Sequence, residues 1–262
     1  MSALILRSSP VAGVVVLTLN RPDVYNALSE GMLAALQTEF DQLASDKTAR
    51  VVIIAANGRA FCAGHDLKEM RAEPSTEYYQ RLFNQCSQLM LSLQKLPQPV
   101  IAQVHGTATA AGCQLVAMCD LAVASTTSRF AVSGVTLGLF CSTPAVALSR
   151  NLPRKQALHM LLTGDFIDAQ TALTNHLVNE VVEPQNLEQA TLALAQKILS
   201  KPPAAVTLGK QLFYKQIETS LEHAYELASQ TMACNMMNPD ALEGIQAFID
   251  KRPPTWAIKN QE

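Results

Sequence analysis

Two short segments rich in small residues, each between an apolar run and a helix-like stretch, most constrain how this chain folds. Residues 60–70 read AFCAGHDLKEM, and residues 106–115 read GTATAAGCQL. Small side chains let main-chain amides approach a ligand, and a helix N-terminus carries partial positive charge. Two such turns can therefore aim two amides at one anionic oxygen. Either segment alone is equally compatible with a plain strand-to-helix turn.

Apolar runs and helical patterns alternate through the first half of the chain, which predicts an α/β fold with crossover connections. Ser29 precedes a helical pattern that runs to about Ser45. Further helices are expected at 78–96 and 112–118, and strands at 4–7, 14–19, 51–56, 100–104, 121–124 and 179–182. After Pro144 the pattern is mostly helical, with helices expected at 145–152, 155–162, 169–175, 187–199, 204–214, 221–237 and 240–248.

Composition and charge exclude several classes of function. The chain has 262 residues, of which 48% are hydrophobic, enough for one large core with a C-terminal extension. Its net charge of −2 gives no basic field to hold nucleic acid or an anionic membrane surface. It has no run of 18 apolar residues, so no transmembrane helix is expected. We therefore expect neither nucleic acid nor membrane as a partner.

Cysteine usage and the start of the sequence suggest where the protein works. None of the six cysteines forms a Cys-x-x-Cys pair, and most lie in apolar surroundings, which favours reduced thiols. The chain passes almost at once into strand-like sequence, without the pattern of a signal or transit peptide. We expect a cytoplasmic location on these grounds.

Further motifs follow one another in a fixed order from about Leu17 to Pro254. They are Asn20-Arg21-Pro22, Asn26-Ala27-Leu28, Phe61-x-Ala63-Gly64-x-Asp66-Leu67-Lys68-Glu69-Met70, Gly106-x-x-x-x-x-Gly112-Cys113-x-Leu115, Cys119-Asp120, Leu162-Thr163-Gly164, Leu177-Val178 and Glu243-Gly244. Together they resemble the enoyl-CoA hydratase/isomerase (crotonase) family. Residues 138–144, GLFCSTP, resemble one subgroup of that family most.

The resemblance implies a fold and an assembly. The expected fold is an α/β, crotonase-type spiral of repeated strand-strand-helix turns with a helical C-terminal region. The spiral core would occupy residues 1–200, and residues 201–262 would form the helical trimerisation region. The expected assembly is a homotrimer or a dimer of trimers, in which a neighbour's Phe248 and Lys251 help to close the site.

The resemblance also implies a ligand and the residues that hold it. The backbone N–H groups of His65 and Ala111 would form an oxyanion hole around the carbonyl oxygen of an acyl- or enoyl-CoA thioester. No cofactor is expected to be bound permanently, because coenzyme A arrives as part of the substrate, and no metal site is expected. The positions that match coenzyme A-binding residues are Val24, Tyr25, Ala27, Ala63, His65, Asp66, Leu67 and Lys68. Lys68 is either a phosphate partner or a solvated lysine.

Two residues depart from the family's hydration chemistry. Family hydratases use two glutamates to deliver water, and those positions fall at Gln114 and Gly134 in this chain. A glutamine orients water but cannot usefully accept its proton, and a glycine offers no side chain at all. Because each general acid or base contributes about a hundred- to ten-thousandfold, standard hydration is doubtful.

Other side chains leave alternatives open. The imidazole of His65 is either an acid or base beside the thioester or a residue packed against loop backbone. Ser142 is a candidate polar group of the acyl pocket, although a serine without a base is a poor nucleophile. Cys113 and Cys141 are either nucleophiles or small wall residues. The resemblance thus implies an enoyl-CoA hydratase/isomerase-type enzyme that stabilises an enolate. The alternatives are a CoA-thioester hydrolase or decarboxylase and a non-catalytic acyl-CoA-binding or scaffold subunit.

Overall fold

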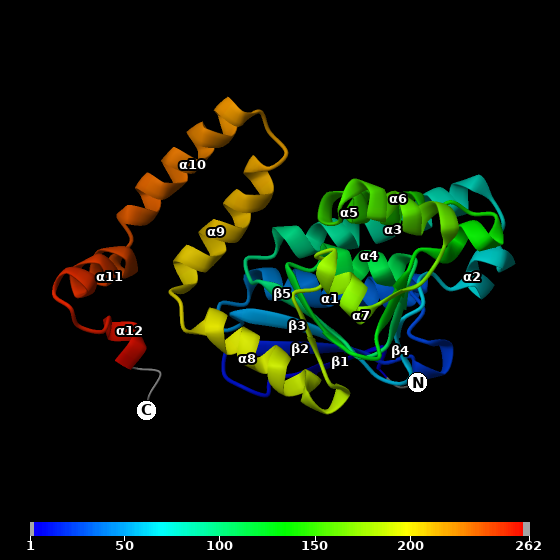
Figure 1. Cartoon of the computed structure of the whole chain (residues 1–262), viewed down its shortest axis with the longest axis horizontal. Coiled ribbons are helices and arrows are strands. Elements are labelled where there is room, and N and C mark those ends of the chain that lie inside the picture. The colour runs from blue at the N-terminus through cyan, green and yellow to red at the C-terminus, as the bar shows by residue number, and fades with distance from the viewer. Residues whose placement is uncertain (1–2, 259–262) are drawn as a thin grey trace.

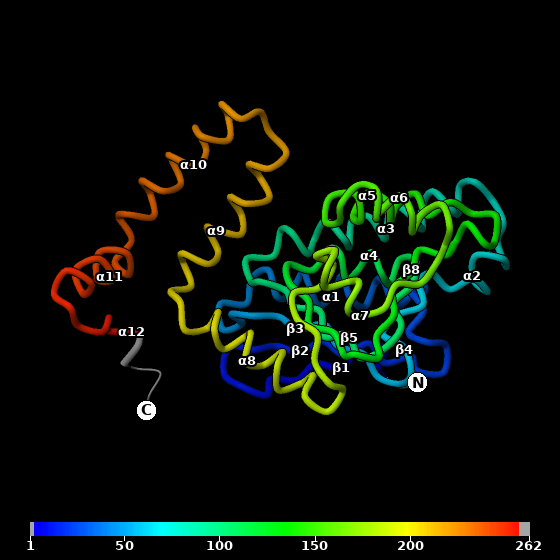
Figure 2. The backbone as a smooth tube through the Cα atoms, in the orientation of Figure 1, coloured from blue at the N-terminus to red at the C-terminus, as the bar shows by residue number. Residues whose placement is uncertain are grey.

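The computed structural model describes residues 3–258 and contains the expected spiral of strand-strand-helix turns (Figures 1 and 2). In each turn a longer strand leads into a short strand, and helices return the chain to the next turn. The first turn contains β3 (Val51–Ala56), β4 (Ala60–Cys62), α2 (Leu67–Ala72) and α3 (Thr76–Lys95). The second contains β5 (Val100–Val104), β6 (Thr107–Thr109) and α4 (Ala111–Met118). The third contains β7 (Leu121–Ser125), β8 (Arg129–Ala131), η2 (Ser133–Leu137), α5 (Ser142–Asn151) and α6 (Arg154–Thr163).

The longer and the shorter strands form separate sheets. The six-stranded sheet has the order β1-β2-β3-β5-β7-β10, and the four-stranded sheet has the order β4-β6-β8-β9. Most neighbours are parallel, whereas β1 pairs with β2, and β8 with β9, in antiparallel fashion. The remaining strands are β1 (Ile5–Ser8), β2 (Val14–Leu19), β9 (Ile167–Asp168) and β10 (Glu180–Val182).

The strands of the smaller sheet were not predicted from the sequence. Ala60–Cys62 and Thr107–Thr109 were expected to belong to loops, but each forms a three-residue strand. Three residues are too few to show an alternating pattern, and neighbouring glycines and alanines made both segments look like turns. These strands form because β3 and β5, which precede them, are paired in the longer sheet. That pairing brings β4 and β6 side by side, so their main chains can pair as well.

Helix starts match the capping residues of the sequence. α1 (Glu30–Ser45) begins after Ser29, whose hydroxyl accepts a hydrogen bond from the Met32 amide at 3.1 Å. α3 begins after Ser75 in the same way, at the amide of Tyr78. Both helices bury an apolar face in the core that the longer sheet covers. The other core helices are α7 (Ala169–Thr174) and α8 (Leu187–Leu199). The elements labelled η are short 3-10 helices, and besides η2 they are η1 (Pro22–Val24) and η3 (Pro184–Asn186).

The C-terminal helices extend away from the spiral as an arm, with α10 returning alongside α9 (Figure 1). A buried ion pair joins the arm to the core, because Lys210 Nζ donates to Asp120 Oδ2 at 2.7 Å. Within residues 3–258, no helix combines the length and the apolar character needed to cross a membrane. The arm consists of α9 (Pro203–Gln216), α10 (Leu221–Met236), α11 (Pro239–Ile249) and α12 (Thr255–Ile258).

Candidate functional site

The two small-residue turns lie against each other. β4 and β6 are parallel neighbours, with Ala60 beside Thr107 and Cys62 beside Ala108. A Cβ atom on Gly64 would lie 2.8 Å from that of Ala110, and one on Gly112 would overlap the carbonyl of Cys62. Gly64 also has a φ of +90°, a conformation that side chains rarely adopt. Glycines are therefore needed for the turns to approach this closely.

Two main-chain amides are free at this contact. Ala111 is the first residue of α4, so its amide has no acceptor within the helix. The amide of His65 donates to no carbonyl of residues 3–258, although its neighbour Asp66 donates to Leu28 at 3.3 Å. Ala110 has φ 49° and ψ −120°, a strained conformation for a residue with a side chain. Strain of this kind is typical of functional sites, and here it sets the direction of the Ala111 amide.

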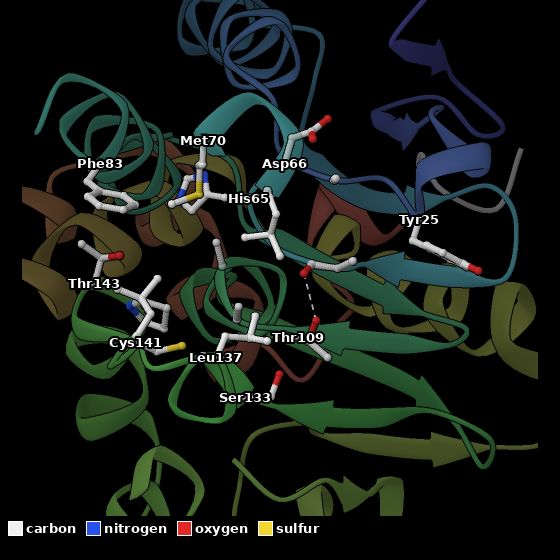
Figure 3. Close-up of a pocket in the computed structure, with 18 of the residues that line it drawn as sticks. Tyr25, His65, Asp66, Met70, Phe83, Thr109, Ser133, Leu137, Cys141 and Thr143 are labelled. Atoms are coloured by element: carbon white, nitrogen blue, oxygen red, sulfur yellow. Dashed lines mark hydrogen bonds between the residues drawn. The ribbon is translucent and has the colours of Figure 1, made fainter. Parts of the chain in front are cut away.

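Both amides belong to residues that line a cavity of about 590 Å³ (Figure 3). It brings together every expected coenzyme A-binding residue of the N-terminal part of the chain, as well as Ala111, Gly134 and Ser142. The lining residues are Asp23, Val24, Tyr25, Ala27, Ala63, His65, Asp66, Leu67, Lys68, Met70, Phe83, Thr109, Ala110, Ala111, Ser133, Gly134, Leu137, Leu139, Phe140, Cys141, Ser142, Thr143 and Pro144.

One wall of the cavity is the turn that contains Val24, Tyr25 and Ala27. Tyr25 and Asn26 both have a φ of 54°, so the chain turns sharply and leaves the Tyr25 side chain exposed. The buried Asn26 side chain donates to the carbonyls of Asn57 and Ala60 at 2.8 and 2.9 Å. The turn is also tied to the first small-residue turn, because the Leu28 amide donates to the Gly64 carbonyl at 2.7 Å. Val24, Tyr25 and Ala27 are thus held beside the free amides.

Asp66 has a structural role in addition to its place on the wall. Its side chain accepts hydrogen bonds from the amides of Lys68 and Glu69 and so caps the start of α2. It also pairs with Arg21 at 3.2 Å. This carboxylate is therefore engaged before any ligand arrives, whereas the exposed Lys68 beside it makes no ion pair within residues 3–258.

The imidazole of His65 is packed into the wall rather than solvated. It contacts the ring of Phe83 edge to face, with 5.4 Å between ring centroids. Both ring nitrogens are buried and neither makes a hydrogen bond of good geometry among the described residues, although the Leu28 main chain lies near enough to the ring to oppose the fall in its pKa. Burial lowers the pKa of this imidazole, so it is neutral at physiological pH.

Gln114 and Gly134 occupy very different surroundings. Gln114 is buried on α4, its Oε1 atom has no partner within the described residues, and it is not among the residues that line the cavity. Gly134 does line the cavity, but a Cβ atom there would lie 2.5 Å from the Leu139 carbonyl oxygen and 2.7 Å from Cys141 Sγ. The backbone is therefore built for glycine, and no larger side chain fits at this point without a shift of the loop.

The remaining candidate side chains are weak nucleophiles. Burial raises the pKa of the Cys113 thiol to about 12 and also raises that of Cys141, so both stay protonated near neutral pH. Ser142 is exposed at the cavity, and its hydroxyl donates to the Phe140 carbonyl at 3.3 Å. All six cysteines are free, and five of them are buried.

Three expected residues, Gln114, Phe248 and Lys251, are not among those that line this cavity, and others were missed. Phe248 lies in the last turn of α11 and Lys251 follows that helix, which belongs to the arm that extends from the spiral (Figure 1). Met70, Phe83 and Thr143 line the cavity but were not predicted. Met70 and Phe83 lie on helices whose apolar pattern looks like ordinary core. Within residues 3–258 no cluster of His, Cys, Asp or Glu is placed to hold a metal ion.

Comparisons with known proteins agree with this arrangement. Residues 10–259 match the sequence profile of the family described as enoyl-CoA hydratase/isomerase. A Xenopus laevis protein named enoyl-CoA hydratase domain-containing protein 3, mitochondrial, is 50% identical over 93% of this chain and 83% of its own length. A Mycobacterium smegmatis enoyl-CoA hydratase structure is 61% identical, with a TM-score of 0.96 over 97% of this chain and 99% of that one. The structure of human enoyl-CoA hydratase domain-containing protein 3 is 46% identical, with a TM-score of 0.93 over 97% and 100% of the two chains. The subgroup that residues 138–144 indicated is the group named enoyl-CoA hydratase domain-containing protein 3, and these relatives confirm it.

The expected cytoplasmic location is contradicted. The relatives from Xenopus laevis, mouse and human all carry the word mitochondrial in their names. The expectation relied on reduced cysteines, and reduced thiols are compatible with any reducing compartment. These names point to mitochondria instead.

Proposed function

The chain belongs to the enoyl-CoA hydratase/isomerase family, and we propose that it binds CoA thioesters and stabilises an enolate-like oxyanion. The thioester oxygen would accept hydrogen bonds from the amides of His65 and Ala111. The observation that carries the proposal is that both amides are free and belong to adjoining turns that line one cavity. Each donor of this kind stabilises a transition state by about 3–4 kcal/mol.

The rest of the cavity suits the two ends of such a ligand. The turn at Val24–Ala27 and the exposed Lys68 offer a surface and a positive charge for the coenzyme A portion. The acyl portion would lie between His65 and Phe83 on one side and residues 133–144 on the other. The volume of about 590 Å³ is in the range of ligand sites, and wall residues such as Phe83 and Leu137 are apolar.

Hydration of a simple enoyl-CoA is not the activity we propose. Two carboxylates, Asp23 and Asp66, are among the residues that line the cavity. Asp23 is exposed to solvent, and Asp66 already pairs with Arg21 and caps the start of α2, so neither is a free base inside the cavity. A reaction that needs an enolate but no protein carboxylate, such as decarboxylation of a malonyl-type CoA ester, fits these surroundings better. The second candidate, an acyl-CoA-binding subunit without turnover, is favoured by the same lack of a free base.

Binding and turnover are tested in one series. Calorimetry with acetyl-CoA, a long-chain acyl-CoA and free CoA should detect binding, and mass spectrometry should then screen acyl-, enoyl- and malonyl-type esters for turnover. Binding without turnover of any ester would leave the non-catalytic role. No binding at millimolar ligand would overturn the proposal.

A separate variant, Ala111→Pro, tests the proposed oxyanion hole. Ala111→Pro removes one amide at the first position of α4, where that donor has no acceptor within the helix. Proline also restricts the residue before it, and Ala110 has a φ of 49° and a ψ of −120°, so thermal melting must check the fold. We expect turnover to fall about a hundred- to a thousandfold. His65→Ala keeps the amide of residue 65 and therefore tests the imidazole alone. A folded Ala111→Pro protein with full turnover would contradict the assignment.

A further inference from the structure

The imidazole of His65 lies unsatisfied in the wall of the cavity. It occupies the same side as Met70 and Phe83, and Thr143 and Cys141 lie across the cavity from it (Figure 3). Both ring nitrogens are buried, and neither makes a hydrogen bond of good geometry among the described residues. The residue as a whole is nevertheless half-buried, so its exposed surface belongs to carbon atoms and the main chain.

Such an arrangement costs free energy in the unliganded molecule, because buried nitrogens without partners lose their hydrogen bonds to water. A half-turn of the ring about the Cβ–Cγ bond exchanges nitrogens and carbons within almost the same volume. It would bring a nitrogen to a position that a ring carbon now occupies. A ligand that offers a hydrogen bond there would relieve the cost, whereas a hydrocarbon ligand would not.

We propose that His65 selects acyl groups that carry a hydroxyl or carbonyl oxygen beyond C3, through a hydrogen bond from its ring to that oxygen. This inference rests on the proposed binding of CoA thioesters. The thioester oxygen lies at the amide of His65, and the ring extends from there towards Phe83 on α3. Acyl atoms that pass the ring are therefore those further along the chain than C3.

The surroundings of the ring suit a neutral hydrogen-bonding group. Burial keeps the imidazole uncharged, so it carries one donor and one acceptor. Met70 and Phe83 beside it are apolar, and they would exclude water from the new hydrogen bond. Thr143 lies on the facing side of the cavity and its hydroxyl makes no hydrogen bond within residues 3–258, so the cavity offers a second polar contact to an acyl oxygen.

The test compares ligands that differ only by a methyl group in place of a hydroxyl. The pairs are pentanoyl-CoA with 4-hydroxybutyryl-CoA, and hexanoyl-CoA with 5-hydroxypentanoyl-CoA. Calorimetry with the wild-type protein should show about tenfold tighter binding of one hydroxy ester than of its methyl partner. Nitrogen-15 NMR of the histidine ring should show a shift with that hydroxy ester and none with the methyl ester.

Variants identify the group responsible. His65→Phe should remove the preference, while His65→Gln, which keeps a polar end, should restore part of it. Met70→Leu is the matched control on the same wall, and we expect it to change both members of a pair alike. Equal binding of both pairs by the wild type, an unchanged ring signal, or a preference that persists in His65→Phe would each overturn the inference. Failure of every CoA ester to bind would instead overturn the proposed function.

Discussion

At the scale of single residues, Gly134 shows how strongly one position fixes the local backbone. Its missing side chain leaves room for the Leu139 carbonyl and Cys141 Sγ. We expect Gly134→Ala to lower the free energy of unfolding by about 1–3 kcal/mol, as overpacking does. Urea unfolding measures this. Gly209→Ala on α9 is the matched control, since a Cβ there meets nothing within 4 Å, and it should stabilise by about 0.4–1 kcal/mol.

The same geometry bears on hydration. We expect wild-type protein to hydrate crotonyl-CoA poorly, because neither Gln114 nor Gly134 supplies a carboxylate. Gln114→Glu, Gly134→Glu and the double variant should all remain slow, since a glutamate at Gly134 cannot enter without displacing Leu139. Loss of enoyl absorbance at saturating substrate measures the four proteins. Wild-type turnover near a thousand per second, the top of the usual range, would contradict this.

The buried His65 imidazole should make stability depend on pH. Burial lowers its pKa in the folded chain, whereas the unfolded chain takes up the proton near pH 6.5. The unfolded state therefore binds more protons just below pH 6.5, so stability should fall as the pH falls through that region. Above it, this group adds no pH dependence. Urea midpoints between pH 5 and 8 should show a flatter profile for His65→Phe, and an identical profile would show that another group is responsible.

How far the sequence predicts the site also depends on individual residues. The turn residues Val24, Tyr25 and Ala27 and the two amide residues line one cavity, because motifs fix main-chain geometry, while their roles stay predictions. Phe83 was missed because a helix residue that faces a cavity has the same apolar pattern as one that faces the core. The close approach of Leu139 and Cys141 to Gly134 depends on contacts within the folded chain, and no sequence motif predicts such contacts.

At the scale of elements, the Lys210–Asp120 pair attaches α9 to the core. Lys210 Nζ also donates to the carbonyls of Leu93 and Gln98, and the Tyr214 hydroxyl donates to Asp120 at 2.8 Å. Burial lowers the pKa of Lys210, and Asp120 partly offsets this. We expect Lys210→Met to cost about 3–5 kcal/mol in urea unfolding, because it leaves a buried carboxylate without its cation.

The exposed ion pair between Arg150 and Glu218 provides a comparison for the buried Lys210–Asp120 pair. Arg150 and Glu218 are 3.0 Å apart, with side chains 52% and 60% exposed. Arg150→Met should change stability by less than about 1 kcal/mol. Equal losses in both variants would show that burial of the Lys210 pair has no special effect.

Elements were predicted well where they are long. The expected bounds of β2, β3, β5 and α8 agree with the structure because each has a sustained apolar pattern and clear flanking residues. The second sheet was missed because β4, β6 and β8 each have three residues. Their pairing is decided by the neighbouring turn of the spiral, since Ala60 pairs with Thr107 and Thr107 pairs with Arg129, far apart in the sequence.

At the scale of the whole molecule, the arm is too apolar for a surface that stays in water. Phe213, Leu221, Tyr225, Met232, Met237 and Phe248 are each more than half exposed on α9–α11. An extended arm with such a surface is typical of subunit contacts, and the family resemblance implies trimers. We therefore propose that this surface packs against other copies of the chain, which would bring Phe248 and Lys251 to a neighbour's cavity.

This assembly predicts the mass in solution and the effect of one charge. Light scattering at micromolar protein should give three or six times the 28.4 kDa chain mass. Phe248 is 85% exposed in the single chain, so a change there has little reason to disturb the fold of that chain. Phe248→Asp should shift the protein towards smaller species, because a charge buried in an apolar contact loses its hydration. Phe248→Leu keeps the apolar contact and should leave the assembly intact. A wild-type protein that is a 28.4 kDa monomer at this concentration would contradict the proposal, and the apolar arm would then need a different partner.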